Sequence, residues 1–144
     1  LEVPVVVKEV GNGIGGHDAR RLFDAGVRVI DVAGAGGTSW SEVERFRQPG
    51  EPGRRVAGAF ADWGIPTTEC VRQVRAAVPE ATVIASGGVR SGVDVAKAVA
   101  LGADLAGTAK PALLSAVDDF IRELRVAMFC AGCATLADLR ALSL

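Results

Sequence analysis

The chain has 144 residues, 49% of them hydrophobic, and its 16 basic and 17 acidic side chains give a formal net charge of −1. This composition suits one compact soluble domain, and the near-neutral charge argues against nucleic acid as the main partner, because phosphate-binding surfaces usually carry a basic excess. No apolar stretch approaches the roughly 18–20 residues that span a membrane, and nothing resembles a secretory signal. The odd number of cysteines, three, indicates free thiols in a reducing compartment, so we expect a cytoplasmic protein.

The first half of the chain predicts two strand–helix units. Both strands are apolar, β-branched runs, which is typical of a parallel sheet covered on both faces. The expected elements are a strand over 3–11, a helix over 17–26, a strand over 27–34, a glycine-rich loop over 33–40 and a short helix over 41–47. Ser39 and Glu42 have capping-box spacing at the start of the short helix. Residues 48–55 contain two Pro-Gly pairs and are predicted to form a surface loop.

The second half of the chain continues the same alternation. Residues 56–66 predict a helical turn. The following elements are an amphipathic helix over 67–79 capped by Thr67, a strand over 81–88, a helix over 91–103 opened by Ser91, a short strand over 104–109, a long helix over 111–132 with a potential break near Asp118, and a short helix over 135–142. Val71, Val74 and Val78 form the expected buried stripe of the first of these helices.

Repeated strand–helix units make a parallel α/β sheet with helices outside it, and two architectures compete. One is a doubly wound open sheet, because "GNGIGG" at 11–16 loosely matches its G-x-G-x-x-G turn and Asp31 lies near enough to keep this interpretation open. The other is a (β/α)8 TIM-barrel type with four βα units present, that is, half a barrel over 1–144. Glycine clusters follow the predicted strands. They favour the barrel, because its active site lies at the ends of the strands.

Two of these glycine-rich loops predict a phosphate site. Gly87 and Gly88 lie between a strand and the helix that Ser91 opens. A ligand can approach the main chain closely there, and the first helical N–H groups have no internal partner. The last strand ends in "AGTAK", 106–110, whose small residues permit the same approach. Two neighbouring loops of this kind would form one phosphate cup, and the alternative is a pair of tight turns without a ligand.

Lys8 is the second informative residue, because a lysine in a sheet buried on both faces is costly unless it meets a negative partner. Alternation places Val6 and Lys8 on one side of the strand and Val7 and Glu9 on the other. If Val7 faces the helices, Lys8 faces the barrel mouth, where its ammonium could stabilise an anion such as a reduced flavin. The alternative is that Lys8 has already emerged into solvent.

Other residues are weaker candidates. Thr38 could bond a flavin or substrate oxygen and Trp40 could wall an apolar pocket, although an ordinary loop explains both equally well. His17, the single histidine, is expected at the surface. "CAGC" at 130–133 has redox spacing but follows a helix, and the chain lacks the further ligands of a zinc site. Asp31 flanks a strand and is expected to be structural.

Five segments together resemble the C-terminal half of the type 2 isopentenyl diphosphate isomerases, which are FMN-dependent (β/α)8 enzymes. They are "VVVKEVGNGI", "VIDVAGAGGTSWSEVE", "FADWGIPT", "VIASGGVRSGVDVAKAVALGADLAG" and "ELRVAMFCAG", in order over essentially the whole chain. The combination of KEVG, GGTSW and ASGG is specific, whereas each of them alone would also suit other FMN barrels, such as the α-hydroxy-acid oxidases.

The resemblance implies a role for each candidate residue. Lys8 matches the lysine near the flavin ring and is the implied catalytic residue, and Thr38 matches a threonine that contacts FMN. Trp40 matches an aromatic position beside the hydrocarbon of the substrate. The residues that match the two FMN-phosphate loops are Gly87, Gly88 and Val89 in the first and Ala109 and Lys110 in the second. Ala33 stands where many relatives carry a serine that contacts the flavin.

The family interconverts isopentenyl and dimethylallyl diphosphate with FMN, Mg²⁺, and NADPH as the flavin reductant, so the resemblance implies these substrates and cofactors. The family's first four strands and its metal-binding glutamate are not in these 144 residues. We therefore expect the Mg²⁺ ligand in a missing N-terminal half, an exposed apolar sheet edge here, and a homo-oligomer or a pairing with the missing half. The alternatives are an inactive half-barrel that self-associates and another FMN barrel that oxidises a hydroxy acid.

Overall fold

Four short parallel strands form the centre of the molecule. The computed structural model describes residues 3–109 and 113–142. The strands are β1 (Val6–Lys8), β2 (Val29–Asp31), β3 (Thr82–Ala85) and β4 (Leu105–Ala106), hydrogen-bonded in the order β1-β2-β3-β4. Each predicted strand is present but shorter than its apolar run, because only the residues paired in the ladder belong to the sheet.

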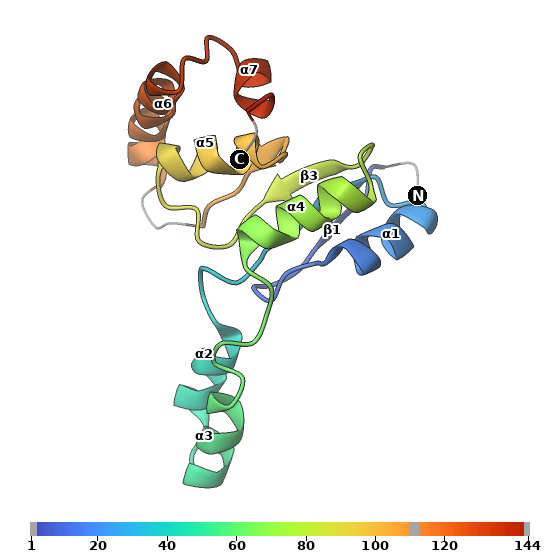
Figure 1. The fold of residues 1–144 in the computed structure, drawn as a ribbon. Coiled ribbons are helices and arrows are strands. Elements are labelled where there is room, and N and C mark those ends of the chain that lie inside the picture. The colour runs from blue at the N-terminus through green and yellow to red at the C-terminus, as the bar shows by residue number, and fades with distance from the viewer. Residues whose placement is uncertain (1–2, 110–112, 143–144) are drawn as a thin grey trace.

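Helices alternate with the strands, as predicted. They are α1 (Gly16–Asp24), α2 (Trp40–Arg47), α3 (Glu51–Gly58), α4 (Thr67–Ala77), α5 (Gly92–Ala100), α6 (Leu113–Cys130) and α7 (Leu136–Arg140). Figure 1 shows α1 and α4 side by side against one face of the sheet, while α6 and α7 pack on α5. Among the helices that the structure describes, none combines the length and the apolar character needed to cross a bilayer.

The order of the strands separates the two competing architectures. All four strands are parallel, and each pairs with the next one along the chain. A doubly wound sheet reverses its strand order at a switch point, whereas a (β/α)8 barrel adds strands in sequence. The (β/α)8 type with four βα units present is therefore confirmed, and the dinucleotide-binding interpretation of "GNGIGG" is wrong.

One face of the sheet packs against α1 and α4. Val7, Ile30 and Val83 lie in register on this face, and Ile30 and Val83 are fully buried. The helix side of this core includes the predicted stripe of Val71, Val74 and Val78, each completely buried. Cys70 lies in the same core, where burial raises the pKa of its thiol to about 11.

The opposite face of the sheet is largely open. Lys8, Asp31, Ile84 and Leu105 share a row of the ladder and face this side. Leu105 on the last strand is 56% exposed, and Val6 on the first strand is 50% exposed. The apolar edge expected for half a barrel is therefore present at both ends of the sheet.

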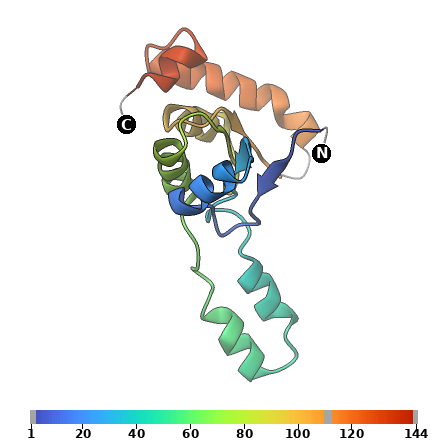
Figure 2. The ribbon, with the colours of Figure 1, turned by 90° about the vertical axis from the view of Figure 1, so that its right-hand side faces the viewer.

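Residues 48–55 form part of a helical hairpin, so the prediction of a surface loop there was wrong. Helix α3 begins at Glu51, with Gly50 as its N-cap and Pro52 in its first turn. Proline is tolerated in a first turn because the missing N–H would have no partner there, and its fixed φ suits the helix. Helices α2 and α3 pack on each other, and Figures 1 and 2 show that the pair projects away from the sheet.

Two helix details also differ from expectation. Pro66, and not Thr67, is the N-cap of α4. The Thr67 hydroxyl instead donates to the carbonyl oxygens of Ser86, at 3.1 Å, and Gly87, at 2.7 Å. Helix α6 continues past Asp118 without a break, because one exposed aspartate costs a helix far less than a proline would. The predicted caps at Ser39 and Ser91 are confirmed, since each hydroxyl accepts an N–H three residues on.

Candidate functional site

A cavity of about 850 Å³ lies where the four strands end. It has the size of a ligand pocket, roughly 300–1,000 Å³. Its lining includes every predicted site residue that the structure describes: Lys8, Thr38, Trp40, Gly87, Gly88, Val89 and Ala109. Lys110, the remaining predicted residue, lies outside the described residues. The loops after β3 and β4 thus open into the same cavity as the lysine at the end of β1.

Lys8 lies at the mouth of this cavity because its neighbour Val7 packs into the core beneath the helices. Its Nζ donates to the carbonyl oxygen of Glu9 at 2.9 Å and lies 3.6 Å from Oδ2 of Asp31. The side chain is 54% exposed. The lysine therefore has the negative partner that a position in the sheet requires, and its ammonium remains open to the cavity.

The adjacent glycines serve a purpose that the sequence did not suggest. Gly87 and Gly88 have φ values of +98° and +83°. A Cβ on Gly87 would lie within 2.1 Å of the Gly34 carbonyl oxygen, and one on Gly88 within 2.5 Å of the Gly36 carbonyl oxygen. The two loops pack backbone against backbone, which only glycine permits. The absence of Cβ atoms at these two glycines therefore allows the loops after β2 and β3 to pack against each other.

The amides of this loop remain available to a ligand. Within the described residues, the N–H groups of Gly87, Gly88 and Val89 donate to no protein acceptor. The start of α5 offers fewer free N–H groups to an anion than expected. The Gly92 N–H donates to Glu123 Oε2 at 2.6 Å, and the Asp94 N–H donates to the Ser91 hydroxyl. An anion would therefore be held by the loop amides more than by the end of the helix.

Arg90 ties the loops after β2 and β3 together. Its guanidinium donates to the Gly36 carbonyl oxygen at 2.7 Å, and its N–H donates to Asp94 Oδ2 at 3.0 Å. Burial alone would raise the pKa of Asp94, but the hydrogen bonds from Arg90 and Ser91 outweigh it and hold that pKa below its ordinary value. Arg90 lines the cavity, so it supplies positive charge beside the glycine amides.

Thr38 and Trp40 line the side of the cavity formed by the loop after β2. Trp40 is the first residue of α2 and is 55% exposed. A Cβ on Gly11 would lie 2.9 Å from the Thr38 carbonyl oxygen and 3.7 Å from Trp40 Cδ1. The loop after β1 therefore lies against this segment because Gly11 has no side chain.

Sequence reasoning missed two polar residues of the cavity floor. Asp31 was expected to be structural, and Ser86 was not considered, yet both line the cavity. The Ser86 hydroxyl donates to Asp31 Oδ1 at 2.6 Å. Their positions in the sequence could have indicated them, because both lie where a predicted strand meets a glycine-rich loop. Asp31 lies two residues before Ala33, and Ser86 directly precedes the glycine pair.

The other reactive side chains lie elsewhere. His17 is exposed at the start of α1, as predicted, and does not line the cavity. Cys130 and Cys133 are free thiols near the end of α6. In residues 3–109 and 113–142, no group of three or more His, Cys, Asp or Glu side chains is arranged to hold a metal ion.

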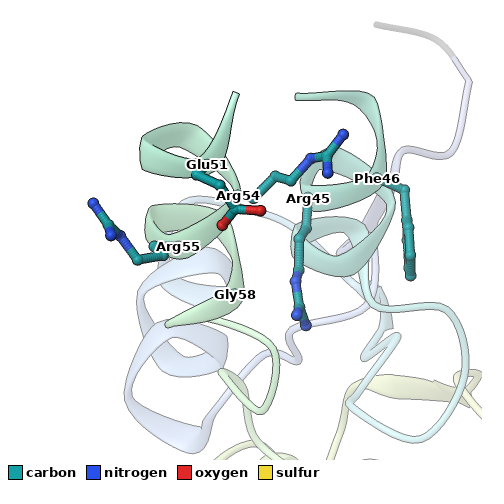
Figure 3. Close-up of a pocket in the computed structure, with 6 residues that line it drawn as sticks. All are labelled: Arg45, Phe46, Glu51, Arg54, Arg55 and Gly58. Atoms are coloured by element: carbon teal, nitrogen blue, oxygen red, sulfur yellow. The ribbon is translucent and has the colours of Figure 1, made fainter. Parts of the chain in front are cut away.

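A second cavity, of about 480 Å³, lies between α2 and α3. Figure 3 shows its lining residues, which come from these two helices alone: Arg45, Phe46, Glu51, Arg54, Arg55 and Gly58. None of them belongs to the cavity at the strand ends, so this cleft does not enter the site described above.

Comparison with known proteins places the chain in a family. The family model for FMN-dependent dehydrogenases matches residues 1–144. The chain belongs to the FMN-dependent dehydrogenase family. Curated isopentenyl-diphosphate delta-isomerases of Nostoc sp. and Xanthobacter autotrophicus are 51% and 56% identical to it, over 97% of this chain and 43% of theirs. The predicted resemblance to these isomerases is therefore confirmed, and the chain spans less than half of the length of these relatives.

Solved structures agree with this membership of the FMN-dependent dehydrogenase family. A mandelate oxidase carrying a monooxide FMN adduct superposes on 99% of this chain with a TM-score of 0.70 at 29% identity. The chain covers 42% of that structure, and another mandelate oxidase structure gives the same TM-score. The four βα units thus correspond to part of a larger FMN-dependent fold.

Proposed function

We propose that this chain is the FMN-phosphate half of a (β/α)8 enzyme that isomerises isopentenyl diphosphate to dimethylallyl diphosphate. The observation that carries the proposal is the shared cavity, into which Lys8, the 87–89 loop and Ala109 all face. Curated relatives more than 50% identical to this chain are isopentenyl-diphosphate delta-isomerases. Because the chain spans 43% of their length, activity would belong to the completed barrel.

The residues present fit FMN. The N–H groups of the 87–89 loop, together with Arg90, offer donors and positive charge to a phosphate. Thr38 offers a hydroxyl on the wall of the same cavity, and the second phosphate loop would be formed by Ala109 and Lys110. When bound and reduced, FMN supplies a ring that carries negative charge beside the substrate.

The roles of the remaining residues follow from this arrangement. The Lys8 ammonium stabilises negative charge on the ring, because a fixed cation next to a developing anion needs no reorganisation. Trp40 lies beside the hydrocarbon of the substrate and keeps water from it. The isomerisation gains a proton at one carbon and loses one at another, with no net oxidation. The chain's own contribution is therefore to position both groups and to stabilise charge.

The metal ligand and the flavin reductant would come from outside this chain. The Mg²⁺ ligand that holds the diphosphate would come from the complementary half of the barrel, and NADPH would reduce the flavin. The complementary half would cover the open face that carries Val6 and Leu105, within one longer chain or in a homo-oligomer. We place the enzyme in the cytoplasm, because its free cysteines suit a reducing compartment.

A comparison of FMN with riboflavin tests the phosphate cup in this chain. Flavin fluorescence during titration should show tighter binding of FMN than of riboflavin. Ala109→Glu should weaken FMN binding about tenfold or more, because it adds a like charge at the phosphate. Ala109→Gln, of nearly the same size, should change it little, and neither variant should alter riboflavin binding. Equal affinity of the Glu and Gln variants for FMN would refute the cup.

The isomerase activity needs a second measurement. The chain, joined to the remaining part of a curated relative, should convert isopentenyl diphosphate to dimethylallyl diphosphate, followed by proton NMR. Lys8→Met in the same protein should lower the rate by at least about a hundredfold while FMN stays bound. An unchanged rate in this variant would remove Lys8 from the mechanism.

Oxidation of a hydroxy acid is the competing activity, since mandelate oxidases share the fold. Such a site would need a histidine and an arginine after its later strands. The single histidine, His17, lies on α1 and outside the cavity. The position of His17 therefore favours isomerisation.

A further inference from the structure

A buried carboxylate lies beneath the cavity at its centre. Asp31 is the last residue of β2, the strand between β1 and β3. It is 7% exposed, and its carboxylate contacts a residue at or just after the end of each of these three strands. These partners offset the free energy of burying the charge, and removal of one of them would destabilise the site.

Each oxygen of this carboxylate has its own partners. Oδ2 faces the Lys8 ammonium from β1 at 3.6 Å. Oδ1 accepts the Ser86 hydroxyl after β3 at 2.6 Å and the Ala33 N–H after β2 at 3.2 Å. One side chain therefore fixes the lysine, the turn after its own strand and the residue before the glycine pair.

The turn at Ala33 needs such support. Its φ of +36° is the single positive value of a non-glycine residue in the described parts of the chain. L-residues adopt this region at a cost, and they persist there when the surroundings hold them. The hydrogen bond from the Ala33 N–H to Asp31 holds it, and the loop that carries Thr38 leaves from this point.

We infer that Asp31 is the positioning residue of the site. Its charge holds the Lys8 ammonium at the cavity, and its other oxygen sets the loops on either side. The inference rests on the proposed function for the role of Lys8 toward the flavin. Asp31 itself acts through Lys8, Ala33 and Ser86.

The reactivity of the lysine amine tests the inference without any flavin. An acylating reagent reaches a lysine side chain more easily when no carboxylate holds that side chain in place. The chain has three lysines, and exposed Lys97, whose own contact with Asp94 is the same in every variant, provides an internal reference. In Asp31→Asn, the rate of acylation of Lys8 relative to Lys97, read by peptide mass spectrometry, should rise about twofold to fivefold.

The choice of variants separates positioning from folding. Asparagine keeps an oxygen that can accept from Ser86 and Ala33 but presents an amide to Lys8, so circular dichroism should show a folded protein. Ser86→Ala keeps the charge of Asp31 but removes the hydroxyl that orients its Oδ1, so the carboxylate can turn away from Lys8 and the relative rate should rise about twofold. An unchanged rate in folded Asp31→Asn overturns the inference. If Asp31→Asn does not fold, an unchanged rate in Ser86→Ala overturns it.

The reduction potential of bound FMN shows whether this positioning reaches the flavin. Asp31→Asn should lower the potential in the same direction as Lys8→Met, and the double variant should fall no further than Lys8→Met alone. Additive shifts would mean that Asp31 acts on the flavin by another route and would overturn the inference. If the chain binds no FMN but Asp31→Asn still shows faster acylation of Lys8, the proposed function is wrong, whereas the inference that Asp31 positions Lys8 holds.

Discussion

At the scale of single residues, Glu9 organises the loop that follows β1. Its Oε2 accepts the N–H groups of Val10, Gly11 and Asn12 at 2.6–2.8 Å, and that of Gly13 at 3.3 Å. Burial alone would raise the pKa of the Glu9 carboxyl, but these four donors outweigh it and lower the pKa below its ordinary value of 4.5. The loop that lines the cavity is thus held by a charge.

Glu9→Gln should destabilise the chain in a pH-dependent way. A carboxyl whose pKa is lowered by folding adds stability above its unfolded value, and this stability is lost as the pH falls through the lower folded value. At about pH 7 the variant should unfold about 0.5–1 kcal/mol more easily, a modest figure because the group is partly exposed. The thermal midpoints of the two proteins should converge as the pH falls below about 4.

Glu80→Gln is the matched control for this effect. Glu80 is exposed beyond the end of α4, so its replacement should change the midpoint little at any pH. A Glu9→Gln deficit that stays constant down to about pH 3 would show that the carboxylate charge does not support the loop.

Part of the site could be predicted from the sequence alone. The placement of Lys8 followed from strand alternation, and the cavity face of the glycine loops followed from their position after strands. The contacts of Gly87 with Gly34, and of Asp31 with Ser86, join segments more than 50 residues apart. Such pairings depend on which loops meet in space, which local periodicity does not encode.

At the level of helices and strands, the α2–α3 hairpin packs mainly on itself and is weakly anchored to the sheet. Neither helix contains a buried residue, and Phe46 on α2 is 80% exposed. At the base of the hairpin, the Ser41 hydroxyl of α2 donates to the Phe60 carbonyl oxygen after α3 at 2.6 Å, which ties the two arms to each other. Its sequence looked like a loop because Pro-Gly pairs usually end helices, while here one proline begins a helix.

The hairpin should therefore open far more readily than the rest of the fold. Helices of eight residues are marginal in water without tertiary packing. Amides of α2 and α3 should exchange with solvent at least about a hundredfold faster than those of α4, measured by hydrogen-exchange mass spectrometry. Helix α4 is a suitable reference, because it buries Cys70, Val71 and Val74. Equal protection in the two regions would mean that a partner covers the hairpin in solution.

At the scale of the whole molecule, the two faces of the sheet have different environments. The face with Val83 is packed under helices, whereas the face with Leu105 is largely open. The continuous apolar, β-branched runs predicted a sheet covered on both sides. The structure shows one covered side because the chain carries four of the eight strands of a barrel. Under the proposed function, the complementary half of the barrel would cover this second face.

Because Val83 is buried and Leu105 is mostly exposed, we expect their replacement by alanine to have different effects on stability. Leu105→Ala should change the free energy of unfolding of this chain by less than about 0.5 kcal/mol, because its side chain is mostly in water. Val83→Ala should cost about 2 kcal/mol or more, because it opens a cavity in the core. Urea unfolding followed by circular dichroism measures both.

The contrast should change when the barrel is completed. Joined to the remaining part of a curated relative, the chain would bury Leu105, so Leu105→Ala should then cost about 2 kcal/mol or more. A large cost of Leu105→Ala in the chain alone would instead mean that another surface already covers this face. Sedimentation would then identify a second copy of the chain by its mass.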